Sequence, residues 1–90
     1  MRKRARVVVH GLVQGVNFRW YTTEQARRHE LGGWVRNTAD GTVEAVFEGA
    51  EDAIQRLIEW CKVGPRSARV EWVDVTWEEP EGLFSFDVDF

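Results

Sequence analysis

The sequence has little cysteine and proline, and it contains no run of about 18 apolar residues of the kind that spans a membrane. A single cysteine, Cys61, cannot form an intramolecular disulfide, so we expect a reducing compartment, the cytoplasm. The apolar stretch after the basic N-terminus is short and ends at Gln14-Gly15, where a signal peptide would need small residues. These absences argue against a disulfide-stabilised secreted protein and a membrane protein.

What is present is typical of one globular domain. The chain has 90 residues, of which 43% are hydrophobic and 30% charged. We see no repeat, low-complexity segment or linker, so we expect a single domain over residues 1–90. The net charge of −3 argues against general affinity for nucleic acid.

The spacing of apolar residues predicts two helices interleaved with strands. Gly32-Gly33 is expected to stop the first helix and Asp40-Gly41 to form a hairpin turn. In the fourth strand the alternation of apolar and polar residues changes phase after Trp72, which predicts a bulge near Trp72. Strands are expected at residues 4–13, 34–37, 42–48, 68–78 and 84–90, and helices at 18–31 and 50–61.

This element order favours an α+β fold. We expect a two-layer, ferredoxin-like sandwich (a split βαβ arrangement), with both helices on one face of an antiparallel sheet. The five tryptophans and Cys61 are interpreted as mainly core or sheet-face packing residues. The last strand ends with Phe90, whose terminal carboxylate could reach a cation that the sequence does not identify.

The loop from Gln14 to Arg19 is the segment best suited to chemistry. Successive backbone N–H groups before a helix can converge on one oxyanion, and the helix N-terminus adds positive potential. Arg19 supplies a planar guanidinium that matches phosphate geometry. The residues alone also allow a simple strand-to-helix turn with a surface arginine, and the GxxxxGK[ST] pattern of a nucleotide P-loop is absent.

Two segments carry a resemblance to a known family. The run from Gly11 to Arg19 (GLVQGVNFR) resembles the first acylphosphatase signature, and the run from Gly33 to Asn37 (GWVRN), followed by Gly41, Val43 and Gly49, resembles the second. Both match at their defining positions, and the resemblance covers essentially the whole chain. The chain is therefore identified as similar to small, free-standing acylphosphatases of prokaryotic type.

The resemblance implies roles for the matching residues. Arg19 would bind the substrate phosphate, helped by backbone N–H groups of the loop, and Asn37 would orient the attacking water through its side-chain carbonyl. Thr38 would support that water or Asn37. His29 departs from the apolar residue usual in the family, and we interpret it as structural or surface-exposed, like His10. The implied catalytic pair is Arg19 and Asn37, and the implied substrate-binding residues are Gln14, Gly15, Val16, Asn17, Phe18, Arg19 and Thr38.

The chemistry of an acyl phosphate explains why so few residues would suffice. Its leaving group is a carboxylate whose conjugate acid has a pKa of about 4, so it departs at neutral pH without a general acid. Charge stabilisation and alignment then remain as the main tasks. We therefore expect a metal-independent hydrolase without a cofactor, which cleaves acyl phosphates to carboxylate and inorganic phosphate.

Two alternatives remain open at this point. Fold does not establish function, so the chain could be a catalytically silent or regulatory acylphosphatase-like domain. A single-stranded RNA-binding module is a further alternative, because the same architecture binds bases on sheet aromatics. The expected partner is a small acyl phosphate, and we expect a monomer that binds neither nucleic acid nor membranes.

Overall fold

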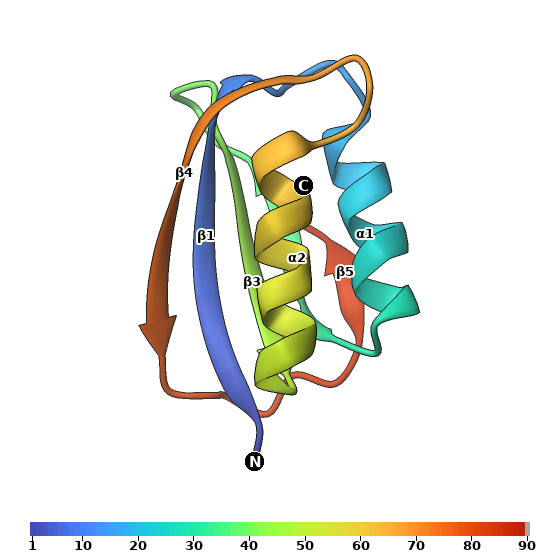
Figure 1. Ribbon diagram of the computed structural model, residues 1–90, viewed down its shortest axis with the longest axis vertical. Helices are drawn as coiled ribbons and strands as arrows, with labels where there is room; N and C mark the ends of the chain where they lie inside the picture. The colour runs from blue at the N-terminus through green and yellow to red at the C-terminus, as the bar shows by residue number, and fades with distance from the viewer. Residues whose placement is uncertain (90) are drawn as a thin grey trace.

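The computed structural model describes residues 1–89 as two helices packed on one face of a five-stranded sheet (Figure 1). Phe90, predicted to end the last strand, lies outside the described residues. The predicted two-layer ferredoxin-like α+β sandwich is confirmed. The helices are α1 (Phe18–Arg28) and α2 (Glu51–Val63), and the strands are β1 (Lys3–Leu12), β2 (Gly32–Asn37), β3 (Val43–Gly49), β4 (Arg69–Glu78) and β5 (Phe86–Val88).

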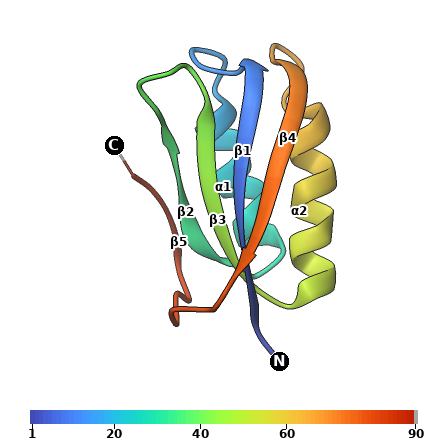
Figure 2. The ribbon, with the colours of Figure 1, turned by 90° about the vertical axis from the view of Figure 1, so that its left-hand side faces the viewer.

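The order of strands places three chain segments at one end of the sheet. The order is β4-β1-β3-β2-β5, seen from the face opposite the helices in Figure 2. Because β1 and β2 both pair antiparallel with β3, they run parallel to each other and end on the same side. The predicted antiparallel sheet holds for four strands, whereas the short β5 pairs parallel with β2. The loop before α1 therefore lies at the same end as the last residues of β2 and β5.

The end of α1 differs from the prediction. The helix ends at Arg28, because Glu30 takes a left-handed conformation (φ 58°) and the backbone around it closes the last turn. Gly32 and Gly33 do not stop the helix but begin β2. A Cβ on Gly33 would lie 1.8 Å from the carbonyl oxygen of Val46, so this glycine allows β2 and β3 to approach closely.

The bulge predicted near Trp72 is confirmed. His10 on β1 pairs with Trp72, but the next residue, Gly11, pairs with Val70, which leaves Glu71 as the extra residue of β4. The bulge reverses the alternation of β4, so Val70 and Val73 both pack against the core although they are three residues apart.

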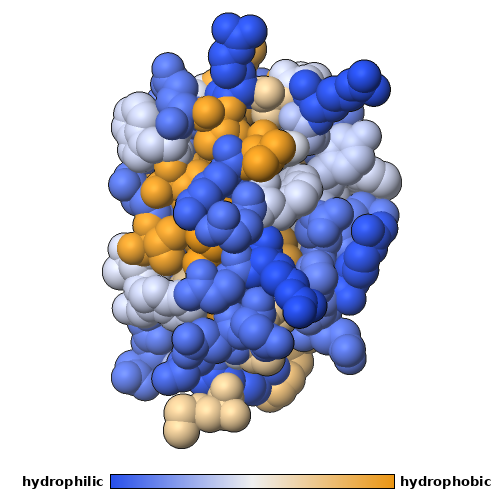
Figure 3. Space-filling view, viewed as in Figure 1, coloured by the Kyte–Doolittle hydropathy of each residue, from blue (hydrophilic) through white to orange (hydrophobic). Residues whose placement is uncertain are grey.

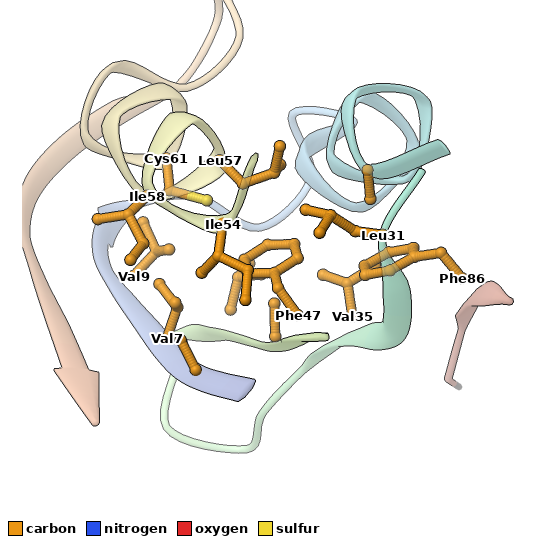
Figure 4. Packing of buried hydrophobic residues seen from close by; sticks show 14 of the residues in the cluster. Val7, Val9, Leu31, Val35, Phe47, Ile54, Leu57, Ile58, Cys61 and Phe86 are labelled. Carbon is orange, nitrogen blue, oxygen red and sulfur yellow. The ribbon is translucent and has the colours of Figure 1, made fainter. Parts of the chain in front are cut away.

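The core lies between the helices and the sheet, where the side chains labelled in Figure 4 pack together. Phe47 of β3 and Phe86 of β5 stack with ring centroids 5.6 Å apart, which anchors the short edge strand. Cys61 is fully buried, and burial raises the pKa of its thiol to about 12. Its predicted packing role is confirmed.

The outer surface is mainly hydrophilic on the helix side, with a smaller group of hydrophobic residues (Figure 3). The expectation that tryptophans are packing residues is only partly met. Trp60 packs edge-on against Phe18 and Trp72 stacks on His10, but Trp20 is 59% exposed. No helix among residues 1–89 combines the length and apolar composition needed to cross a membrane.

Ion pairs link three strands on the face without helices. Arg4 contacts Glu48 and Glu78 at 2.6 and 2.8 Å, while Arg6 contacts Glu44 and the same Glu78 at 2.6 and 2.8 Å. Arg4 and Glu48 are almost completely buried, whereas Arg6 and Glu78 are about one-third exposed. The charged residues therefore tie β1, β3 and β4 together.

The carboxylate of Glu48 also anchors the connection between β4 and β5. It accepts hydrogen bonds from the backbone N–H groups of Glu81, Gly82 and Leu83 at 2.9, 3.1 and 3.0 Å, in addition to the bond from Arg4. Burial alone would raise the pKa of Glu48, but these hydrogen bonds outweigh it and hold the pKa below its ordinary value. Glu48 is thus a buried, ionised anion that the chain itself supplies.

Candidate active site

The loop that joins β1 to α1 has an unusual backbone path. Gly15 and Asn17 have positive φ angles of 75° and 63°, and α1 begins directly afterwards at Phe18. The Phe18 side chain is buried in the core, and the partly buried Val16 packs against the same core. Both residues therefore anchor the loop to the core. Left-handed residues followed by helical ones turn successive N–H groups in one direction, which suits an oxyanion.

Beside this loop lies a pocket of about 300 Å³. It brings Arg19, from the first turn of α1, together with Asn37, the last residue of β2. These two residues come from the two sequence segments that resemble the acylphosphatase signatures. The residues that line the pocket are Val13, Gly15, Asn17, Phe18, Arg19, Trp20, Asn37 and Val88.

The hairpin after Asn37 holds the neighbouring Thr38 firmly. The hydroxyl of Thr38 hydrogen-bonds with the Asp40 carboxylate and lies 2.6 Å from the hydroxyl of Thr42. These hydroxyls, with the backbone N–H of Thr42, lower the pKa of Asp40 to about 2. Gly41 has a φ of 93°, and the predicted hairpin turn is confirmed. Thr38 therefore supports the turn that carries Asn37 and does not line the 300 Å³ pocket.

Gln14 connects the two halves of the site. Its side-chain amide donates hydrogen bonds to the carbonyl oxygens of Thr38 and Thr42 at 2.8 and 2.9 Å. The carbonyl oxygen of Val16 accepts a bond of 3.2 Å from the hydroxyl of Ser67. Of the predicted substrate-binding residues, Gln14, Val16 and Thr38 thus lie beside the pocket, whereas Gly15, Asn17, Phe18 and Arg19 line it.

Three residues that line the pocket, Val13, Trp20 and Val88, were not among the predicted site residues, although Val13 lies within the first signature run. Trp20 follows Arg19 directly and lies outside the buried stripe of α1, which could have marked it as exposed beside the site. No local signal marked Val88. Its place follows from the parallel pairing in which it lies opposite Val35.

Both histidines lie away from the residues that line the pocket. His10 stacks on Trp72 with ring centroids 4.2 Å apart, and its Nε2 lies 2.9 Å from a carboxylate oxygen of Asp74. His29 is the C-terminal cap of α1. Within residues 1–89, no three His, Cys, Asp or Glu side chains gather as metal ligands.

The pocket has a positive character. Arg19 and the N-terminal end of α1 border it, and no acidic side chain is among the lining residues that the structure describes. Asn37 offers a side-chain carbonyl that can accept a hydrogen bond from water. The arrangement can therefore hold an anion beside a positioned water, as expected for a small α+β hydrolase.

Comparison with known proteins agrees with this class. The family model for acylphosphatase matches residues 5–90. The acylphosphatase of Chloroflexus aurantiacus is 56% identical over 91% of this chain and 92% of its own, and that of Thermococcus kodakarensis is 53% identical over 97% and 96%. The crystal structure of acylphosphatase from Bacillus subtilis superimposes with a TM-score of 0.95 at 37% identity, covering 100% of both chains. The chain belongs to the acylphosphatase family and is a hydrolase that acts on acid anhydrides.

Proposed function

We propose that this acylphosphatase hydrolyses acyl phosphates in the pocket between α1 and β2, with Arg19 and Asn37 as its catalytic pair. The observation that carries the proposal is that both side chains line one pocket beside the loop of residues 15–19. A guanidinium, a helix N-terminus and an amide carbonyl together suit a phosphate and a water.

In this mechanism the phosphate lies against the loop. The backbone N–H groups from Gly15 to Arg19 and the Arg19 guanidinium donate hydrogen bonds to its oxygens. The Asn37 carbonyl accepts a hydrogen bond from the attacking water and aligns it opposite the leaving oxygen. The water oxygen bonds to phosphorus as the bond from phosphorus to the acyl oxygen breaks. A carboxylate leaves with that electron pair, and the proton of the water passes to a phosphate oxygen.

The leaving group determines how little else is needed. A carboxylate leaves at neutral pH without protonation, and a loose phosphoryl-transfer transition state needs little help from a base. The binding groups at the loop supply charge stabilisation, and Asn37 supplies alignment. The proposal therefore includes neither a metal nor a cofactor.

The other assignments follow from where the residues lie. Gln14 and Thr38 act as positioning residues, because the Gln14 amide links the loop to the Thr38 carbonyl oxygen and the Thr38 hydroxyl holds the hairpin itself. Asn17 supports the loop path through its left-handed conformation. We also propose a single domain over residues 1–90, a cytoplasmic location and a monomeric enzyme without nucleic-acid or membrane partners.

The two alternatives have less support. On the face without helices, the central strands β1 and β3 present charged residues such as Arg6 and Glu44, rather than the aromatic platform of an RNA-binding sheet. Nothing in the comparisons favours an RNA-binding module or a silent domain. Turnover by the purified protein would exclude a silent domain directly.

The proposal is tested by hydrolysis of benzoyl phosphate in EDTA. Wild type is expected to turn over, and Asn37→Ala is expected to lower kcat by about 10²–10³-fold because the water loses its orienting group. Inhibition by inorganic phosphate should be kept in Asn37→Ala and lost in Arg19→Ala. Circular dichroism serves as the control for folding. Wild-type activity in Asn37→Ala would show that the water site is misassigned, and a folded wild type without turnover would contradict the proposed function.

A further inference from the structure

One side of the pocket is mainly apolar. Trp20 and Val88 line it together with the polar residues, and both present mainly apolar surface. Trp20 is 59% exposed, so most of its indole does not contribute to the core. By contrast, Trp60 is half-buried and packs edge-on against Phe18, with ring centroids 5.4 Å apart.

The position of Trp20 follows from the helix. Trp20 and Arg27 are seven residues, about two turns, apart and therefore lie on the same side of α1. Arg27 donates a hydrogen bond of 2.9 Å to the carbonyl oxygen of Phe86, so this side of α1 faces β5, which lies beside the helix in Figure 1. Trp20 is nearer the N-terminal end of α1, which places it over the end of β5, where Val88 lies.

Tyr21 supports the indole from its other side. The two rings meet edge to face, with centroids 4.9 Å apart and planes at 88°. This arrangement restricts the indole while leaving much of it uncovered. A large, restrained and exposed aromatic surface at the mouth of a pocket is a favourable contact for an apolar ligand.

An acyl phosphate has two chemically different ends. The loop and Arg19 suit the phosphate, whereas the indole face and the Val88 side chain suit an apolar or aromatic acyl group. Arg19 is the sole charged side chain among the described residues that line the pocket. A second anionic group on the substrate would therefore meet no cation of its own there.

We propose that Trp20, together with Val88, forms the binding site for the acyl group and favours acyl phosphates whose acyl group is aromatic or bulky and apolar. The inference rests on the proposed function, because it requires the phosphate to lie at the loop of residues 15–19. The indole contacts the substrate body and sets specificity without taking part in the cleavage step.

The test compares benzoyl phosphate with acetyl phosphate in wild type and Trp20→Ala. We expect the ratio of kcat/KM for benzoyl over acetyl phosphate to fall about tenfold in the variant, mainly through a higher KM for benzoyl phosphate. Trp20→Phe should restore most of the ratio, since it keeps an aromatic face. The matched control is Trp72→Ala, which removes a similarly exposed tryptophan from β4, at the opposite edge of the sheet.

The outcomes separate the two proposals. Equal losses on both substrates, or an unchanged ratio in Trp20→Ala, would overturn the acyl site while leaving the proposed function intact. The same fall in the ratio in Trp72→Ala would also overturn it. Failure of folded wild type to hydrolyse either substrate would instead overturn the proposed function.

Discussion

In two regions of this protein an arginine lies beside a loop whose backbone N–H groups can bind an anion. At one end of the sheet, the N–H groups of residues 81–83 and the side chain of Arg4 surround the carboxylate of Glu48. At the other end, the loop of residues 15–19 and Arg19 border a pocket. We propose that the anion there is the phosphate of the substrate.

The difference between the regions lies in where the anion comes from. Glu48 is part of the chain, so its interactions stabilise every folded molecule. A substrate phosphate contributes only while it is bound, and its site must leave room for it to enter and depart. On this proposal, similar donor groups serve stability in one region and turnover in the other. Removal of the arginine should therefore lower mainly the stability in the Glu48 region and mainly the activity in the pocket region.

The largest effect is expected from Arg19→Ala. Removal of the guanidinium that stabilises the charge of the phosphoryl group should lower kcat/KM for benzoyl phosphate by about 10³-fold or more. The urea midpoint should shift less than in Arg4→Ala. Wild-type kcat/KM in Arg19→Ala would show that Arg19 does not bind the phosphate, and the pocket would then not be comparable with the Glu48 region.

The next effect is on stability. Arg4→Ala leaves the carboxylate of Glu48 buried without its arginine, so the free energy of unfolding should fall by about 3 kcal/mol in urea titrations. The folded fraction should keep kcat within about twofold of wild type. Lys62→Ala is the control, because its pair with Glu59 is exposed and should contribute less than about 0.5 kcal/mol. An equal loss of unfolding free energy in Arg4→Ala and Lys62→Ala would show that the buried ion pair contributes no more than the exposed one.

A smaller effect concerns the dependence of stability on pH. The pKa of Glu48 is lower in the folded protein than its ordinary value of 4.5, so the unfolded chain binds the proton more readily. The stabilisation that the ionised Glu48 contributes is complete above about pH 4.5, and it is lost as the pH falls through the pKa of Glu48 in the folded protein.

In Glu48→Gln that contribution is absent at every pH. The difference in unfolding free energy between wild type and Glu48→Gln should therefore shrink as the pH falls from about 5 to 3, measured by urea titration. Glu59→Gln, which makes the same change at an exposed carboxylate, is the matched control. A constant difference between wild type and Glu48→Gln would contradict a lowered pKa.

Much of the fold could be predicted because its signals are local. The hairpin at Asp40-Gly41 and the helical spacing of α2 are each set by neighbouring residues. Around Trp72 the apolar residues change from one phase of the strand to the other. Because side chains in a strand alternate between its two faces, this change indicated an extra residue, that is, a bulge. The end of α1 was predicted wrongly, since a glutamate, Glu30, adopts the left-handed conformation that usually favours glycine.

The candidate site divides in the same way. Arg19 and Asn37 lie in motifs that can be recognised without knowing the fold, and the structure places both in one pocket. Val88 could not be foreseen, because its role depends on the pairing of β5 with β2 across half the chain. The buried Glu48 was also missed, since a glutamate in an alternating strand ordinarily indicates a solvated position.

The residues that line the pocket, at positions 13, 15, 17–20, 37 and 88, come from almost the whole length of the chain. Pairings between distant segments are costly to form, because the chain loses loop entropy before the contacts compensate. A refolding molecule completes the pocket only when β5 joins the edge of β2. Recovered activity toward a bulky substrate would therefore report that β5 has joined the sheet, which the formation of the helices alone would not.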